Sequence, residues 1–354
     1  MKRFLKIVGV VLLALVVVVG GYVAYVFIDY HRLPDMDAEV ETTGEPVRAG
    51  EVYTIASWNL GFGAYSDDFG FFMDGGTESR AFSREAVLAN IGHAIEVLKG
   101  IGPDFMILQE LDFDATRSHH VDEVGLVTEA MAGFESYFAQ NYDSPYLFYP
   151  ILKPHGASKS GLLTLADKGI ARTARRSLPI ETGVTRFLDL DRCYSKVWMP
   201  LENGKDLVLF NLHLSAYTSD GNIAQDQLEL LVKDMLAEYE AGNYVVGGGD
   251  FNKDVLGNSA EVFGVAGEFN WNQPIPEETF PEGLTLVSSL DADDPVPSSR
   301  VADGPYVEGQ TFVCTLDGFI VSDNVRVESC GVVDEAFKCS DHNPVVMRFE
   351  LVEE

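Results

Sequence analysis

Basic side chains are scarce in this sequence, and their scarcity narrows the functions it can serve. Lysine and arginine number 25 against 55 aspartate and glutamate residues, so the formal net charge at pH 7 is −30. A strongly acidic protein is repelled by nucleic-acid backbones and by anionic membranes. The composition therefore argues against a non-specific nucleic-acid binder, although a locally basic or metal-loaded site could still hold a phosphate substrate.

Cysteine is also scarce, with four residues in the chain: Cys193, Cys314, Cys330 and Cys339. Their spacings do not resemble those of a zinc site. Four cysteines allow three complete disulfide pairings, and the sequence does not choose among them. Buried free thiols are an equally good interpretation, so the disulfide state stays open.

Internal repeats and long low-complexity tracts are absent from the sequence. Of its 354 residues, 46 % are hydrophobic and 11 % are aromatic, which is enough to build a sizeable core. Bulk disorder is therefore not expected. The length suits one large domain or two small ones.

The N-terminus carries an apolar segment that differs from the rest of the chain. Lys2, Arg3 and Lys6 precede an uncharged run over residues 7–28. A helix needs roughly 20 apolar residues to span the hydrocarbon core of a bilayer. A cleaved signal peptide is the alternative, but its apolar region is usually about 7–15 residues long and ends at a small-residue site, which this run lacks. We therefore expect a transmembrane anchor.

The order of charges around this anchor predicts its orientation. Basic residues before the apolar run place the N-terminus in the cytosol by the positive-inside rule. Residues 1–6 would then be cytosolic, residues 7–28 a single-pass anchor in the cell membrane, and the remainder extracytoplasmic. Residues 29–50 are acidic and contain two prolines and two glycines, so we expect a linker there. Residues 51–354 would form the globular domain.

Hydrophobic periodicity predicts more strands than helices in this domain. Helices would fall between some pairs of strands, whereas the middle and final strands follow one another without helices. This order favours two sheets packed face to face with helices outside over a doubly wound parallel sheet. We expect strands at 52–59, 104–109, 207–214, 244–248, 311–321, 325–332 and 343–351, several more within 146–199, and helices at 81–100, 123–132 and 224–240.

Polar side chains recur at the ends of the expected buried strands. Burying a charge in an apolar core is costly, so charges at several strand ends suggest one shared rim where they pair or bind a metal. The residues concerned are Asn59, Glu110, His213, Asp250, Asn252, Asp317, Asp341 and His342.

This inventory contains the groups needed to hydrolyse a phosphoester with water. Carboxylates such as Glu110 and Asp250, together with amide oxygens, are ligands that suit Mg²⁺, and Mn²⁺ or Ca²⁺ would also fit. Such an ion neutralises phosphate oxygens and stabilises a leaving alkoxide. His213 and His342 can move protons, and Asp317 could fix the tautomer of one imidazole.

Six short segments resemble the signature blocks of the endonuclease/exonuclease/phosphatase superfamily, which includes deoxyribonuclease I and the neutral sphingomyelinases. They are SWN (57–59), ILQE (107–110), NLHL (211–214), GGDFN (248–252), TLDGF (315–319) and SDHNPV (340–345). They occur in the family order across residues 51–352. The resemblance implies that residues 51–354 form a catalytic domain with a four-layer α/β/β/α sandwich of two mainly antiparallel sheets, and that the site lies at one end of the sheets.

The resemblance also implies a role for each residue on the metal side of the site. Glu110 would bind the catalytic Mg²⁺, and Asn59 would lie close beside it as part of the metal site. Asp341 would lie near the metal or the attacking water.

For proton transfer, the resemblance implies that His342 acts as general base or polarises the phosphate, and that Asp317 orients it. Asp250 and Asn252 would position water and phosphate. His213 would lie opposite and stabilise the transition state or protonate the leaving group. The division of labour between the two histidines stays open.

A basic stretch over residues 153–176 stands out in the acidic chain. It is either a local phosphate-attracting patch or a solvated strand face. Within it, His155 and Lys159 are the residues we expect to reach substrate.

The loop over residues 61–76 follows Asn59 and contains Phe69, Phe71, Phe72 and Met73. It could grip an apolar part of the substrate or dip into a lipid interface, or it could pack on the core of its own domain. His119 and His120 are expected at the surface and not in a second metal site.

We therefore predict a Mg²⁺-dependent phosphoric ester hydrolase, with a lipid or small phosphodiester favoured as substrate. An extracellular nuclease acting on DNA or RNA is the alternative. A catalytically inactive phosphate-binding module is the alternative of another class. No protein partner is evident in the sequence, and we expect a monomer.

Overall fold

The computed structural model describes residues 1–183, 190–216, 222–265, 272–288 and 295–353. Its centre is a pair of sheets packed face to face. One sheet has the strand order β14-β15-β2-β3-β5-β4, and only its β2–β3 pair is parallel. Its strands are β2 Val52–Asn59, β3 Phe105–Ala115, β4 Glu135–Asp143, β5 Ser158–Ala166, β14 Val325–Val332 and β15 Val345–Leu351.

The second sheet has the order β1-β6-β7-β8-β9-β13-β10, and only its β8–β9 pair is parallel. A short ladder, β11–β12, stands apart from both sheets. The remaining strands are β1 Met36–Glu39, β6 Arg172–Ser177, β7 Cys193–Pro200, β8 Asp206–His213, β9 Tyr244–Asp250, β10 Leu284–Ser288, β11 Ser299–Arg300, β12 Val313–Cys314 and β13 Asp317–Ser322.

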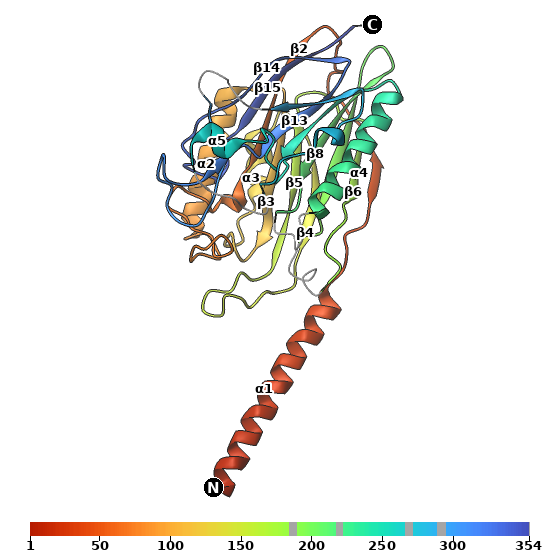
Figure 1. Cartoon of the computed structure of the whole chain (residues 1–354). Helices are drawn as coiled ribbons and strands as arrows, with labels where there is room; N and C mark the ends of the chain where they lie inside the picture. The colour runs from red at the N-terminus through yellow and green to blue at the C-terminus, as the bar shows by residue number, and fades with distance from the viewer. Residues whose placement is uncertain (184–189, 217–221, 266–271, 289–294, 354) are drawn as a thin grey trace.

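Three apolar clusters hold four layers together. The middle cluster joins the inner faces of the sheets, with Phe105 and Phe349 from one sheet and Phe319 from the other. Helices α2 Arg84–Ile101 and α3 Glu123–Ala130 cover the outer face of the β2 sheet, and α4 Asn222–Glu240 covers the outer face of the β9 sheet. The predicted α/β/β/α sandwich is confirmed, and Figure 1 shows the sheets between their helices. Short helical segments are η1 Gly61–Gly63, α5 Ser259–Phe263 and η3 Glu277–Thr279.

Local sequence signals explain where α2 begins and ends. The Ser83 side chain accepts a hydrogen bond from the Ala86 amide at 3.2 Å, which satisfies an orphan donor of the first turn. Gly102 ends the helix in the left-handed conformation that glycine adopts without strain. Between them Val87, Ile91 and Leu98 recur at helical spacing and face the sheet.

Strands β4 and β10 were not predicted from the sequence, and one predicted strand is divided. Strands β4 and β10 lie at sheet edges, where partial exposure weakens the apolar alternation that reveals a strand. The strand expected at 311–321 is split into β12 and β13.

The acidic linker expected over residues 29–50 contains a strand that the sequence did not predict, β1. This strand pairs antiparallel with β6, and all four of its residues are exposed. Its partner strand is basic, and Asp37 lies 3.1 Å from the Arg172 guanidinium and 2.8 Å from that of Arg176. The two strands thus pair with complementary charges. Apolar periodicity does not reveal a strand of this kind, because it has no buried apolar face.

The N-terminal helix α1 Lys2–Asp29 projects from one end of the domain, and the C-terminus lies at the opposite end (Figure 1). Its apolar window has a mean hydropathy of 2.8. This helix is long and apolar enough to cross a membrane. A signal sequence can have the same length and composition.

The four cysteines are free in the structure, and Cys193, Cys314 and Cys339 are buried. This agrees with the free-thiol interpretation. Burial raises the pKa of the Cys193 thiol to about 12, so the thiol is protonated and unreactive at neutral pH.

Candidate active site

The predicted polar residues meet at one end of the two sheets. Asn59 ends β2, His213 ends β8 and Asp250 ends β9. Asp250 pairs with His213 on one side and with Asp317 at the start of β13 on the other. Strand direction therefore delivers these side chains to a common rim, as the pattern of strand ends predicted.

A run of glycines lets β9 approach its neighbours closely enough to place Asp250. Gly249 has φ +141°, and a Cβ there would lie 2.0 Å from the Leu212 carbonyl oxygen. A Cβ on Gly248 would lie 2.6 Å from the ring of Phe319. Larger residues at these positions would force β8 and β13 away from β9.

Glu110 reaches the site through an irregularity in β3. The register between β3 and β5 shifts between Leu108 and Leu111, and Glu110 itself adopts φ +55°. A bulge of this kind re-aims a side chain, and left-handed backbone at a residue other than glycine is a strained state often found at functional sites. Asn252, with φ +46°, shows the same feature.

Asp250 is the hub of the hydrogen-bond network. Its carboxylate accepts from the Asn59 side-chain amide at 3.0 Å and from the Asn252 backbone amide at 2.8 Å. The Nε2 atoms of His213 and His342 lie 3.5 Å and 3.6 Å from Asp250 Oδ2. Burial raises the pKa of Asp250 to about 7, against the lowering effect of His342.

His342 and Asp317 form a buried pair beside this hub. His342 Nδ1 lies 2.8 Å from Asp317 Oδ2, so Nδ1 carries the proton and Nε2 faces the site. Burial alone would lower the pKa of His342, but Asp317 and Asp250 raise it to about 10. The imidazole is therefore cationic at neutral pH.

His213 has the opposite electrostatic character. Its side chain is 3 % exposed, and its Nε2 lies 3.7 Å from Glu110 Oε1. Burial, reinforced by Arg192, lowers its pKa well below the usual value. The site therefore combines one neutral and one cationic imidazole.

Two serines that the sequence did not single out complete the environment of His342. The Ser298 hydroxyl donates to Asp317 Oδ2 at 2.7 Å, and the Ser299 hydroxyl lies 3.3 Å from His342 Nε2. Both fall between the strands expected at 244–248 and 311–321, where no helix or strand was predicted. Nothing in its local pattern distinguishes them from ordinary loop serines.

The side-chain amide of Asn59 has a defined orientation in the structure. Its Oδ1 accepts from the Gly61 backbone N–H at 3.0 Å, which fixes the amide, because an N–H must face an oxygen. Its Nδ2 consequently donates to Glu110 at 3.2 Å. Asn59 therefore contacts the Glu110 carboxylate as a hydrogen-bond donor, and its part in a metal site stays a prediction.

The donor set fits a hard cation held chiefly by Glu110. The Glu110 side chain is 22 % exposed, whereas that of Asp250 is 2 % exposed. Within the described ranges, no three His, Cys, Asp or Glu residues form a group that could hold a metal ion. A carboxylate such as that of Glu110, with water in the remaining positions, is a ligand that hard divalent cations accept. Burial raises the pKa of nearby Asp341 to about 6, and the Glu110 charge adds to this effect, so a cation would relieve the repulsion.

The basic stretch does not form a single phosphate-attracting surface. Lys153 pairs with Glu78, and Lys168 lies 2.9 Å from Asp167. Arg175 is 2 % exposed and donates to backbone carbonyls, including that of Gln140 at 2.7 Å. Lys159 is exposed on β5, and its role as a substrate contact stays a prediction.

His155 lies in a different setting from the one expected for a substrate contact. It is 7 % exposed, and its Nδ1 donates to the Ser79 carbonyl at 2.9 Å. Its ring packs near Phe62, Phe71 and Phe72. These contacts indicate a packing role.

This setting predicts a pH dependence of stability. Burial, with help from Arg117, lowers the pKa of His155 from 6.5 to about 4. Between pH 6.5 and about 4, His155 is protonated in the unfolded chain but not in the folded chain. The free energy of unfolding therefore falls as the pH decreases, by up to about 3 kcal/mol from this residue. Thermal unfolding of His155→Asn should lose this part of the pH dependence. His120→Asn, at an exposed histidine, should retain it, and identical profiles for His155→Asn and the parent would contradict the prediction.

The loop over residues 61–76 packs on the core of its own domain, which was one of the alternatives given for it. Phe69 and Phe71 are buried, whereas Met73 is 52 % exposed. His119 contacts the Ala81 carbonyl at 2.8 Å, and His120 contacts Asp114 at 2.6 Å.

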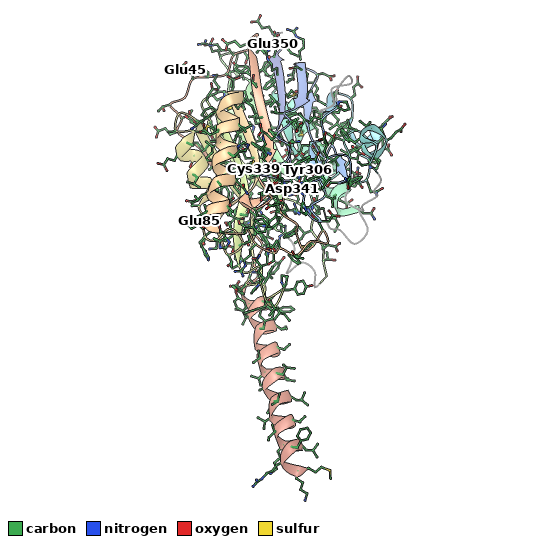
Figure 2. The ribbon with its side chains drawn as sticks, turned by 90° about the vertical axis from the view of Figure 1, so that its left-hand side faces the viewer. Glu45, Glu85, Tyr306, Cys339, Asp341 and Glu350 are labelled. Carbon is green, nitrogen blue, oxygen red and sulfur yellow. The ribbon has the colours of Figure 1, made fainter. Side chains whose placement is uncertain are left out.

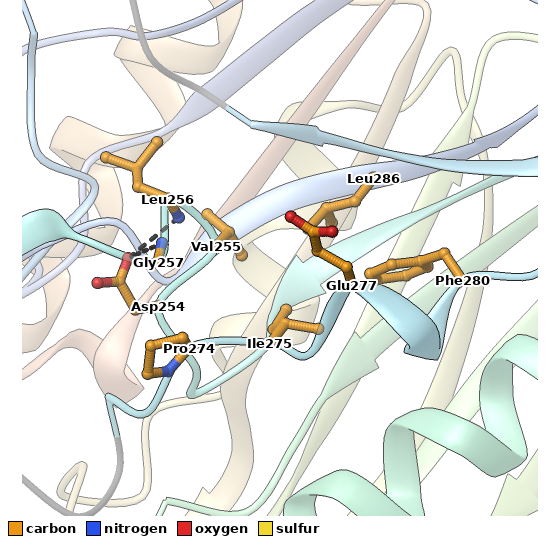
Figure 3. Close-up of a pocket in the computed structure, with 9 residues that line it drawn as sticks. All are labelled: Asp254, Val255, Leu256, Gly257, Pro274, Ile275, Glu277, Phe280 and Leu286. Atoms are coloured by element: carbon orange, nitrogen blue, oxygen red, sulfur yellow. Dashed lines mark hydrogen bonds between the residues drawn. The ribbon is translucent and has the colours of Figure 1, made fainter.

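A separate pocket of about 450 Å³ is lined by residues 254–257, which follow Asn252 in the sequence, and by residues of the segment 274–286 (Figure 3). Its walls include the apolar side chains of Ile275, Phe280 and Leu286 and the carboxylates of Asp254 and Glu277. The Asp254 carboxylate at its border accepts from the backbone amides of Leu256 and Gly257, each at 3.0 Å. None of the predicted catalytic residues lines this pocket.

The sandwich and its carboxylate–imidazole rim define a phosphoesterase-type fold. Residues 56–342 match the model of the Endonuclease/Exonuclease/phosphatase family, and the chain belongs to this family. Members of the family hydrolyse phosphoric esters and generally use divalent metal ions.

Solved structures show the same fold. An endonuclease/exonuclease/phosphatase from Beutenbergia cavernae DSM 12333 is 17 % identical with a TM-score of 0.57, and the match covers 85 % of this chain and 72 % of that one. ANGEL2, a 2′,3′-cyclic phosphatase, is 15 % identical with a TM-score of 0.57, over 91 % and 99 %. A Bacteroides vulgatus member is 14 % identical with a TM-score of 0.53, over 85 % and 99 %. No curated protein matches the sequence significantly.

Proposed function

We propose that this protein is a Mg²⁺-dependent phosphoesterase that cleaves a phosphodiester or phosphomonoester by in-line attack of water. The observation that carries the proposal is the Asp250 hub, which has a histidine on each side and Glu110 beside it. This cluster brings an acid, a base and a metal-binding carboxylate within reach of one phosphate group.

The electrostatics favour a particular division of labour. Cationic His342, held by Asp317, donates from Nε2 to a phosphoryl oxygen and stabilises the charge that develops there. Asp250, whose pKa is raised to about 7, accepts the proton of the attacking water. Neutral His213 donates a hydrogen bond on the Glu110 side, and Asn252 positions the Asp250 carboxylate through its backbone amide at 2.8 Å.

Mg²⁺ would be held by Glu110, with Asp341 nearby, and would supply Lewis-acid stabilisation of the phosphate oxygens. Mn²⁺ or Ca²⁺ would fit the same oxygen ligands. Asn59 serves by holding the Glu110 carboxylate in place through its 3.2 Å hydrogen bond.

The proposed location is the outer side of the cell membrane, with α1 as an uncleaved anchor and the N-terminus in the cytosol. The substrate that we favour is a lipid or small phosphodiester, because the acidic chain repels polyanions and its basic stretch is largely engaged in internal contacts. Nuclease activity would instead give affinity that falls steeply with salt. A panel of DNA, RNA, nucleotides, sphingomyelin and phosphoinositides, assayed at two salt concentrations, separates these substrate classes.

Metal dependence can be tested on a chromogenic phosphodiester. Activity with Mg²⁺ should disappear on addition of EDTA and return with excess Mg²⁺. Glu110→Gln keeps the shape of the side chain but removes its charge, so it should raise the Mg²⁺ concentration needed for half-maximal activity. Glu129→Gln, at an exposed position on α3, should leave the metal titration unchanged. A folded protein without activity on any phosphoester of the panel would indicate a binding module.

A further inference from the structure

The connection between β4 and β5 exposes an unusual number of large apolar side chains. Ile151 is 84 % exposed and Leu152 is 98 % exposed, and Phe148 and Tyr149 are 55 % and 68 % exposed. Contiguous apolar side chains on a protein surface mark a contact with another apolar phase or partner. We refer to residues 146–152 as the apolar loop.

The apolar loop contacts the N-terminal helix. The Tyr22 hydroxyl donates to the Tyr146 carbonyl at 3.1 Å, and the Tyr146 amide donates to the Tyr25 hydroxyl at 3.0 Å. The rings of Tyr22 and Phe148 meet edge to face, with centroids 5.1 Å apart. The loop therefore lies alongside the last turns of α1.

This contact sets the depth of the loop if α1 spans a bilayer. Tyr22 precedes Asp29 by about two helical turns, which corresponds to about 10 Å along the helix axis. Asp29 and the charged residues after it belong in the headgroup region or beyond, so Tyr22 and Phe148 fall near the boundary between headgroups and acyl chains. Tyrosine and other aromatic side chains are enriched at that level.

The domain is also fixed to the segment that follows the helix. Arg32 Nε lies 2.7 Å from Asp191 Oδ1, and His31 Nε2 lies 3.7 Å from Asp143 Oδ2. The buried guanidinium of Arg175 donates to the Leu33 carbonyl at 3.0 Å. With β1 paired to β6, these contacts restrain rotation of the domain about α1.

The topology places the apolar loop at the catalytic end of the domain. Strand β4 ends and β5 begins at the end of the sheet where β2 finishes with Asn59, because β5 runs antiparallel to β3. Figure 2 shows Asp341 on the α1 side of Glu350, which labels the far end of β15. Substrate would thus enter from the side that faces the bilayer.

We propose that the apolar loop inserts into the outer lipid interface and, together with α1, holds the catalytic end against the bilayer, where the site meets phosphoesters of lipid headgroups. This inference rests on the anchor in the proposed function. Insertion is apolar in character, because Lys153 at the end of the loop is paired with Glu78. Zwitterionic lipid should therefore be sufficient for binding.

The test uses the full chain reconstituted in phosphatidylcholine vesicles. A tryptophan is introduced by Leu152→Trp or, as the matched control, by Val52→Trp at an exposed position on the far end of β2. Lipids that carry a nitroxide near the headgroup end of the acyl chain should quench the emission added by Leu152→Trp and leave that of Val52→Trp unchanged. Equal quenching of the two, with α1 inserted, would overturn the inference.

Two further readouts separate this inference from the proposed function. Resistance of the parent protein to alkaline extraction reports whether α1 is inserted, and extraction of the protein would defeat the anchor and the inference together. The double variant Ile151→Asp, Leu152→Asp should lose hydrolysis of vesicle lipid but keep hydrolysis of a soluble chromogenic phosphodiester. Lipid hydrolysis retained by the double variant would argue against a docking role. A parent protein without either activity would refute the proposed function itself.

Discussion

Replacing His342 with alanine is expected to lower kcat by about 10²–10⁴-fold, the usual contribution of a positioned acid–base group. The variant loses the cation that faces the Asp250 hub and leaves the carboxylate of Asp317 without its imidazole partner at 2.8 Å. Rates on a chromogenic phosphodiester with saturating Mg²⁺ measure the effect. Circular dichroism and thermal unfolding establish that the variant is folded.

The pairing with Asp317 allows a sharper form of this test. If the two residues act as a unit, His342→Ala combined with Asp317→Asn should be little worse than His342→Ala alone. His120→Ala, at a histidine whose side chain is 66 % exposed, should keep full activity. Losses that simply multiply in the double variant would show that Asp317 does not work through His342.

The second large effect concerns stability, and it comes from the buried Arg117. Its guanidinium donates to Asp112 Oδ2 at 3.0 Å and to Asp112 Oδ1 at 2.8 Å, beneath the ring of Phe62. Burial raises the pKa of the adjacent Glu123 well above its usual value. Arg117→Met would leave Asp112 buried without its cation, so we expect the free energy of unfolding to fall by about 3–5 kcal/mol.

Urea unfolding in detergent, followed by intrinsic fluorescence, provides the measurement. The matched control is Arg326→Met, which breaks the ion pair with Glu350 where the arginine side chain is 59 % exposed. Exposed pairs contribute about 0–1 kcal/mol, so the control should unfold near the parent midpoint. Similar midpoints for the two variants would refute the assigned role of the buried network.

Much of the fold was predictable because buried strands have a strong signal. The run 52–59 was predicted with the bounds of β2, and the run 207–214 differs from β8 by one residue at each end. The edge strand β14 was predicted at 325–332. The edge strands β4 and β1 were missed, since β4 shows mixed exposure and β1 is held by charge pairs and backbone hydrogen bonds without a buried face. The apolar alternation that predicts a strand from sequence reflects burial of one face. Strand β1 has no buried residue and β4 has few, so this signal is weak in both.

The site, too, was predictable only in part. Carboxylates and imidazoles at strand ends are visible in sequence because charges are unexpected next to apolar runs. Ser298 and Ser299 are ordinary loop residues until the fold brings them to Asp317 and His342. The orientation of the Asn59 amide depends on the Gly61 N–H, which only a three-dimensional structure provides.

Strand β1 has a consequence for how the chain avoids self-association. It occupies the outer side of β6, and without it β6 would present unpaired backbone groups along the margin of a seven-stranded sheet. Open strand margins are templates for edge-to-edge aggregation. The exposed acids of β1, Asp37 and Glu39, in turn discourage a further strand from adding. The peptide that joins helix to domain thus acts as a protective cover, and a fragment trimmed past residue 39 would lose it.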